Sequence, residues 1–207
     1  MSALEPQLQR CTWPGIDEAI YARYHDTEWG VPKSTDREMF EKLILEGFQS
    51  GLSWLTILKK RDTFRQAFDQ FDAAKIARYG DADRARLMAD AGIIRNRLKI
   101  EATIDNARAY LKFTEKRTLA GFLWDFLDGR PQINSYGQHG DVPAQTKLSK
   151  EMSKALKAEG FRFVGPTTMY AFMQASGMVN DHLVTCHRHA PCGALMATFK
   201  APRHGSR

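Results

Sequence analysis

The chain has 207 residues, of which 43% are hydrophobic, which suits one globular domain or two small lobes that share a cleft. It has no run of about 18 apolar residues and no apolar signal-peptide segment in "MSALEPQLQRC", so we expect a cytoplasmic protein without a membrane span. In that reducing compartment, three cysteines argue against a disulfide framework and leave burial or metal binding as their roles.

A net charge of +6 favours a polyanionic partner, but only weakly when taken alone. The positive charge is partly clustered in "KKR" at 59–61, in "RNRLK" at 95–99, and in four lysines at helical spacing between 147 and 157. Each cluster alone is most simply a solvated helix face. Three of them in a small chain raise the odds of a surface that faces phosphates.

Helical periodicity dominates the chain. "STDREMFEKLILEGF" begins with a capping box, in which Thr35 is followed three residues later by Glu38. After the interruption "QSG", helical patterns resume at 52–68, 72–80 and 81–92, again after Asn96, which can cap a helix, and at 118–129. No alternating strand of useful length is present, and the longest irregular stretch is 133–145. We therefore predict an all-α fold.

A helix–turn–helix pattern surrounds residue 160. The first helix ends at Gly160, and Gly165 is followed by Pro166, which suits the first position of a new helix. Such a hairpin can point the backbone N–H of Gly165 at a DNA phosphate, with Lys154 on the preceding helix. The alternative is an ordinary turn between two helices.

Two pairs of possible metal ligands lie near opposite ends of the chain. In "NDHLVTC", His182 and Cys186 are spaced i and i+4, which would place them on one face of a helix. Cys11 and His25 would complete a closed Cys2His2 set, typical of structural zinc. Spacing alone leaves three competitors for the C-terminal half: His187, His189 and Cys192.

One acid lies close to many aromatic residues. Glu46 follows Ile44 and Leu45 on the apolar side of its helix, where a carboxylate needs a partner or a function. It could be a structural glutamate, or it could read the edge of a flat ring held between aromatic faces, as in enzymes that flip a base out of DNA. The aromatic residues in question are Trp13, Tyr21, Tyr24, Trp29 and Trp54.

Several long segments together resemble the 3-methyladenine DNA glycosylase I family, from about Arg10 to Cys186. They are "RCTWP", "YHDTEWGVP", "LEGFQSGLSWLTILKKR", "DAGIIRNRLKI", "NARAYL", "GFRFVGPTT" and "SGMVNDH". The resemblance implies the all-α fold of the helix-hairpin-helix glycosylase superfamily, with a zinc site that ties the terminal segments together. The corresponding domain is expected at 10–190, as two lobes around a base pocket, with a flexible extension at 1–9 and a flexible tail at 191–207.

The resemblance also implies roles for individual residues. The zinc ligands would be Cys11, His25, His182 and Cys186, which demotes the three competitors. Glu46 would be the catalytic and base-reading acid. The base would contact Tyr24 and Trp54, with Trp13, Tyr21 and Trp29 around them.

The implied activity is removal of 3-methyladenine from alkylated double-stranded DNA. We expect a monomeric, monofunctional hydrolase that leaves an abasic site, with Leu52 as a candidate wedge into the gap left by the flipped base and a core position as its alternative. Asp181 abuts a metal ligand and is expected to support it at most. The rival hypothesis is a zinc-stabilised helical DNA-binding protein without chemistry.

Overall fold

The structure, a computed structural model, describes residues 8–202 and is mostly helical over that range. No helix within it has both the length and the apolar character needed to cross a membrane. The helices are α1 (Ala19–Thr27), α2 (Asp36–Gln49), α3 (Trp54–Ala67), η1 (Asp69–Phe71), α4 (Ala73–Ile76), α5 (Asp81–Ala89), α6 (Arg97–Thr114), α7 (Leu119–Asp125), η2 (His139–Asp141), α8 (Lys147–Ala158), α9 (Pro166–Ala175) and α10 (His189–Thr198).

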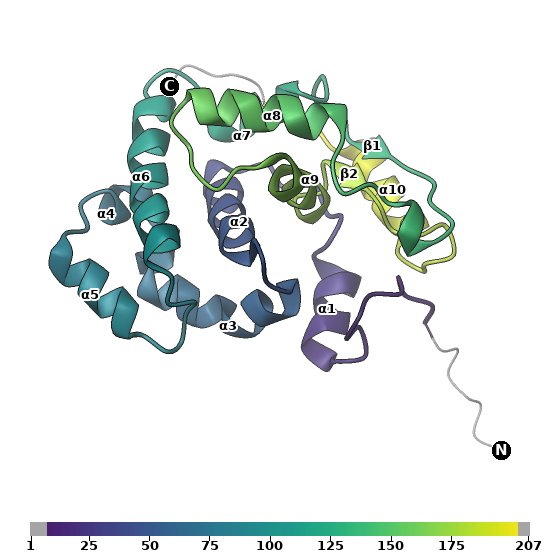
Figure 1. Cartoon of the computed structure of the whole chain (residues 1–207). Helices are drawn as coiled ribbons and strands as arrows, with labels where there is room; N and C mark the ends of the chain where they lie inside the picture. The colour runs from purple at the N-terminus through teal and green to yellow at the C-terminus, as the bar shows by residue number, and fades with distance from the viewer. Residues whose placement is uncertain (1–7, 203–207) are drawn as a thin grey trace.

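Helix α2 lies at the centre of the molecule and is packed against α3, α6, α7 and α9 (Figure 1). Its capping box is formed as expected, since Thr35 accepts from the Glu38 amide and Glu38 accepts from the Thr35 amide. From Met39 to Phe48 nearly every residue is buried, including Lys42 and Glu46. A helix that is buried on most faces can carry charged groups only where they have a partner or a function.

The helix–turn–helix pattern is formed by α8 and α9. Asn106 on α6 holds the turn between them from both sides, donating to the Arg162 carbonyl at 3.1 Å and accepting from the Arg162 amide at 2.7 Å. Gly165 is the N-cap of α9, and Pro166 is its first residue. This arrangement leaves the start of α9 as a defined turn on the surface.

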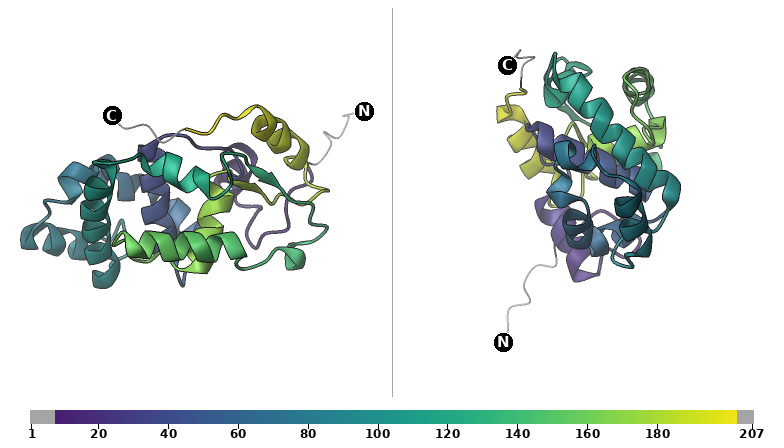
Figure 2. Two further views of the ribbon diagram at one scale, coloured as in Figure 1. Left: turned by 90° about the horizontal axis from the view of Figure 1, so that it is seen from above. Right: turned by 90° about the vertical axis from the view of Figure 1, so that its left-hand side faces the viewer.

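The two terminal segments meet at one end of the molecule. In Figure 2 the residues after position 8 lie near α10, at the end opposite α5. A short parallel sheet of β1 (Gln132–Ile133) and β2 (Val179–Asn180) lies at this end as well. A second buried cluster forms here around Cys11, Tyr24 and Cys186, separate from the main core.

Two expectations for the C-terminal region were wrong in their local structure. His182 and Cys186 lie in a run of turns between β2 and α10, not on a helix. The turn is set by local bonds, from the Cys186 amide to the Leu183 carbonyl and from the His182 amide to the Asn180 side chain. The segment from 191, expected as a tail, continues α10 to Thr198, because Cys192 and Met196 bury one face of it.

Candidate functional site

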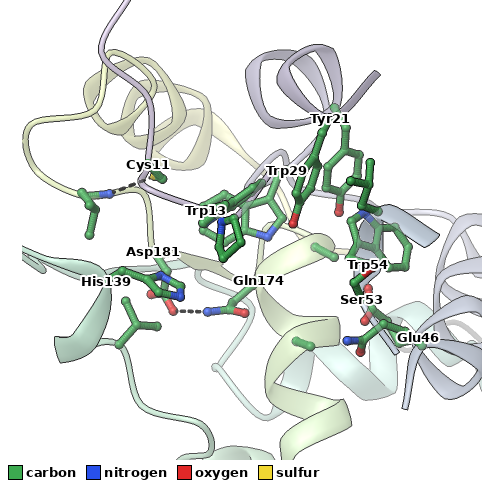
Figure 3. Close-up of a pocket in the computed structure, with 18 residues that line it drawn as sticks. Cys11, Trp13, Tyr21, Trp29, Glu46, Ser53, Trp54, His139, Gln174 and Asp181 are labelled. Atoms are coloured by element: carbon green, nitrogen blue, oxygen red, sulfur yellow. Dashed lines mark hydrogen bonds between the residues drawn. The ribbon is translucent and has the colours of Figure 1, made fainter. Parts of the chain in front are cut away.

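A cavity of about 400 Å³ opens between the N-terminal segment, the start of α3, one face of α9 and the loop after β1. The six residues expected around a base all line it, although they come from three separate segments of the chain (Figure 3). They are Trp13, Tyr21, Tyr24, Trp29, Glu46 and Trp54.

The aromatic residues form a continuous wall because each ring packs against the next. The ring centroids of Trp13 and Tyr21 are 5.1 Å apart, and those of Tyr24 and Trp54 are 5.4 Å apart. Tyr21 and Tyr24 are stacked, with 23° between their planes. Trp29 meets Trp13 edge-on at 4.6 Å. Such a wall offers both ring faces and ring edges to a planar ligand.

Polar groups at the aromatic wall are available to a ligand. The hydroxyls of Tyr21 and Tyr24 belong to two residues that line the cavity, whereas the indole nitrogen of Trp54 is buried without a hydrogen-bond partner within residues 8–202. Burial raises the pKa of Tyr24 well above its usual value and that of Tyr21 to about 12, so both hydroxyls keep their protons. The site therefore offers hydrogen-bond donors beside the ring faces.

Glu46 supplies the acidic group of the cavity from α2. The residue is 3% exposed, and no hydrogen bond or ion pair engages its carboxylate in the part of the chain that the structure describes. Burial raises the pKa of Glu46 to about 7, against the opposing charge of Lys42. Near neutral pH the carboxylate is thus poised between its two forms, and its oxygens are free to accept from a ligand.

Cys11, His25, His182 and Cys186 form a buried group that could hold one metal ion. Their four ligand atoms lie within 4.8 Å of one another. Cys186 Sγ is 3.5 Å from His25 Nε2 and 3.6 Å from His182 Nδ1, and Cys11 Sγ is also 3.6 Å from His182 Nδ1. Four protein ligands would leave no open position for a substrate on a tetrahedral ion.

Acceptors outside this group orient both imidazole rings. His25 Nδ1 lies 2.8 Å from an Asp26 carboxylate oxygen, and His182 Nε2 lies 3.1 Å from the Trp29 carbonyl. When each of these nitrogens carries the proton, the other nitrogen of each ring is unprotonated, as a metal ligand must be, although His25 Nε2 also accepts from the Cys11 amide at 3.4 Å. Burial disfavours the Asp26 carboxylate, but hydrogen bonds from Arg10 and His25 outweigh this and lower its pKa.

The protonation states of the group suit a metal. The hydrogen bond with Cys11 lowers the pKa of the Cys186 thiol, while that of Cys11 is raised in return. A metal ion would bind the thiolate form of both cysteines and release their protons. Burial also lowers the pKa of His182 and so favours its neutral form.

The three competing ligands do not join the group. His187 Nδ1 lies 3.0 Å from the Gln9 carbonyl, and His189 Nε2 lies 2.9 Å from the Asn134 carbonyl. The Cys192 thiol is fully buried and faces the Arg188 side chain at 3.5 Å. The structure thus brings together the four residues that the family resemblance implies.

Asp181 forms the wall of the cavity opposite Glu46, as Figure 3 shows. One carboxylate oxygen accepts from Asn134 at 2.6 Å, and the other accepts from Tyr170 at 2.6 Å and Gln174 at 2.8 Å. This carboxylate is already saturated with donors. Through these hydrogen bonds Asp181, which follows β2, links α9 to the loop after β1.

The expected DNA-contacting residues all lie on the surface. Leu52 is 39% exposed in the turn between α2 and α3, and Lys154 is exposed on α8. The Gly165 amide donates no hydrogen bond within the described chain, so it is free to bind an anion. Lys99 on α6 holds the Leu52 turn by donating to the Phe48 and Ser50 carbonyls at 2.8 and 2.6 Å.

Sequence reasoning missed several residues around the cavity. Gln174 and His139 line it, the second from the stretch expected to be a surface loop. Lys42 is 5% exposed, and its ammonium lies 4.7 Å from the Trp54 ring centroid. The criterion that selected Glu46, a charge within an apolar helical stretch, applies equally to Lys42.

Comparison with known proteins identifies relatives along almost the whole chain. Residues 13–189 match the family model described as methyladenine glycosylase. DNA-3-methyladenine glycosylase 1 of Escherichia coli strain K12 is 48% identical over 180 residues, which is 86% of this chain and 96% of that protein.

Solved structures agree with these sequence matches. A crystal structure of 3-methyladenine DNA glycosylase I superposes with a TM-score of 0.85 at 48% identity, covering 87% of this chain and all of the other. A tyrosine-to-phenylalanine variant of a 3-methyladenine DNA glycosylase I in complex with 3-methyladenine superposes with a TM-score of 0.81 at 33% identity, covering 91% of this chain and 96% of the other.

Proposed function

The chain belongs to the methyladenine glycosylase family and acts as a DNA glycosylase on 3-methyladenine, and from this premise we propose how its residues carry out the reaction. Glu46 reads the cationic base within the aromatic cavity, and water then hydrolyses the N-glycosidic bond to leave an abasic site. The observation that carries this proposal is a buried carboxylate that lines the cavity with no hydrogen-bond partner of its own in residues 8–202.

Charge is the feature that distinguishes the lesion from normal adenine. Methylation at position 3 makes the base cationic and weakens its glycosidic bond, so little acid catalysis is needed. A buried carboxylate favours the cation over the neutral base, because charges interact more strongly away from water. The faces of Trp54 and Tyr24 add cation–π attraction to the same discrimination.

A flipped base would stack on the aromatic wall. Stacking on an aromatic side chain contributes about 1–3 kcal/mol per base and is largely independent of base identity. The wall therefore binds purines in general, while Glu46 supplies the preference for a methylated one. The cavity of about 400 Å³ lies within the range of about 300–1,000 Å³ that is common for small-molecule sites.

The proposed partner is double-stranded DNA, held through the helix-hairpin-helix element of α8 and α9. The free Gly165 amide at the N-terminus of a ten-residue helix is suited to a phosphate. Lys154 adds positive charge from α8, and Leu52 enters the gap left by the flipped base. Since Lys99 anchors the Leu52 turn, the wedge would be held rigidly.

We assign the metal as structural zinc on four protein ligands. With Zn–S of about 2.3 Å and Zn–N of about 2.0 Å, a tetrahedral centre places sulfur and nitrogen about 3.5 Å apart. The observed S–N separations of 3.5 and 3.6 Å fit that geometry. Zinc would hold Tyr24 and Trp29 in place, because Tyr24 precedes the ligand His25 and the Trp29 carbonyl binds the ligand His182.

The reaction is monofunctional because the cavity offers no amine nucleophile. Lysine is missing from its lining residues, as far as residues 8–202 define them. The rival hypothesis of a DNA-binding protein without chemistry gives the unpartnered Glu46 no role. It also has no use for a closed aromatic cavity.

The test is incubation with duplex DNA treated with a methylating agent. Release of free 3-methyladenine, with strand breaks only after alkali treatment, is the expected result. Breaks without alkali would contradict a monofunctional reaction, and DNA binding without base release would favour the rival hypothesis.

A further inference from the structure

Lys42 is a second buried charge beside the cavity, and the reaction as described above does not use it. The residue is 5% exposed and lies one helical turn before Glu46 on α2. Its ammonium lies 4.7 Å from the Trp54 ring centroid and 5.2 Å from that of Tyr24. Both rings line the cavity, whereas Lys42 is not among its lining residues.

Glu28, the other acid that could balance the charge of Lys42, already forms an ion pair. Arg61 on α3 donates to both carboxylate oxygens of Glu28, which follows α1. The remaining acid close to Lys42 is Glu46, whose carboxylate has no donor of its own in the described chain. A buried cation is stable only beside an opposite charge or a strong acceptor.

We propose that Lys42 is a positioning residue for Glu46: its buried ammonium, one helical turn from the carboxylate and against the rings of Trp54 and Tyr24, favours the ionised form of that carboxylate, which reads a cationic base. This inference rests on the role of Glu46 proposed above and deepens it. The proposed chemistry of the site then depends on a residue that does not line the cavity.

Other charged or titratable groups lie near Lys42, near Glu46 or along the cavity, but Lys42 is the charge that acts on the pKa of Glu46. Lys99 on α6 donates to two backbone carbonyls, and Asp181 across the cavity is saturated by three donors. Burial is the larger influence on the pKa of Glu46, and Lys42 is the charge that lowers it. The remaining groups are Tyr21 and Tyr24 on α1, Glu28 after it, Lys33 in the following loop, Arg61 on α3, His139 on η2 and Tyr170 on α9.

The positive charge of Lys42 also has an unfavourable effect on binding of the cationic base. A cation beside the Trp54 and Tyr24 rings repels a cationic base that stacks on them. Burial lowers the pKa of Lys42 to about 8, so this repulsion fades as the pH rises above that value. Removing the ammonium should therefore weaken excision where Glu46 needs help to ionise, and should leave it unchanged or stronger at high pH.

The test is the pH dependence of kcat/KM for release of 3-methyladenine from methylated duplex by the zinc-loaded full chain. Lys42→Met keeps an unbranched apolar stem against the two rings but removes the charge. We expect the acid limb of the profile to move up by about one pH unit, because an opposite charge this close typically shifts a carboxyl by one to three units. Lys33→Met is the matched control, since Lys33 acts on Lys42 but exerts no resolved effect on Glu46.

Lys42→Gln provides a second neutral variant. Lys42→Met combined with Glu46→Gln completes a double-mutant cycle, which measures the interaction between the two residues. Titration of the Glu46 carboxyl carbon by NMR gives a readout that a purely structural role would not move. An acid limb that disappears in Glu46→Gln but stays in place in Lys42→Met would overturn the inference while leaving the role of Glu46 intact. A wild-type profile without any limb that depends on Glu46 would instead overturn both.

Discussion

Replacing Glu46 by glutamine tests the central step of the proposed reaction. The substitution keeps the shape of the side chain and removes its charge. Because no group within residues 8–202 competes for the Glu46 oxygens, the full strength of a charged hydrogen bond should be available to the base. Such a bond contributes about 1.5–3 kcal/mol, and each 1.4 kcal/mol is about a factor of ten. We therefore expect excision by Glu46→Gln to be slower by about tenfold to a hundredfold.

The loss should depend on pH in a defined direction. Burial raises the pKa of Glu46 to about 7, so the wild-type carboxylate is mostly ionised at about pH 8 and mostly protonated at about pH 6. The glutamine variant has no such group to titrate. The gap between the two proteins should thus be widest at about pH 8 and should narrow toward about pH 6.

The assay is single-turnover release of 3-methyladenine from methylated duplex DNA, with zinc content and thermal unfolding as checks of the fold. Glu41→Gln is the matched control, because Glu41 lies on the same helix but pairs with Arg65 and does not line the cavity. An equal rate for Glu46→Gln and wild type at about pH 8 would refute the reasoning, and so would a gap that is the same at both pH values.

Three further outcomes follow from the site. Cys186→Ser should lose zinc along with much of the stability, since such sites contribute on the order of 10 kcal/mol to folding. Cys192→Ser should keep its zinc, as measured by elemental analysis. Loss of zinc from Cys192→Ser would contradict the ligand assignment. Binding to undamaged duplex DNA should weaken steeply as the salt concentration rises. Lys154→Ala should lower the slope of log binding constant against log salt concentration by about one. A binding constant that does not change with salt would remove the basis for a phosphate-facing α8–α9 hairpin. Trp54→Ala should weaken the binding of both 3-methyladenine and adenine, by about 1–3 kcal/mol each, as measured by calorimetry. If only the binding of 3-methyladenine weakened, Trp54 would act through charge and not through stacking.

Local signals in the sequence were enough to predict the α-helices from α2 to α9, but not α1 or α10. The capping box at Thr35, the Asn96 cap and the Gly165–Pro166 start of α9 are all formed. Each depends on contacts between residues a few positions apart, so the chain itself carries the information. Residue type likewise selected the aromatic residues and a set of candidate metal ligands, but the choice of four ligands over three competitors came from the family resemblance.

Residue spacing failed where a tertiary contact replaced the local preference. The i and i+4 spacing of His182 and Cys186 predicted a helical face, but the segment forms turns whose side chains meet Cys11 and His25. Cys192 likewise matched a ligand by type and became part of the packed face of α10. Four ligands that must converge on one point constrain the backbone more strongly than helix propensity does.

The arrangement of charge around the cavity was decided by the tertiary structure alone. In sequence, Lys42 and Glu46 are equivalent charges on a mostly apolar helix. Only the tertiary packing places the Lys42 ammonium against Trp54 and Tyr24, outside the cavity lining, and leaves Glu46 at the cavity surface. Burial and the distance between charges set a pKa, and both arise from contacts between segments far apart in the chain. The sequence by itself thus determined which groups were available, and the fold determined which of them faces the cavity and how burial and neighbouring charge shift its pKa.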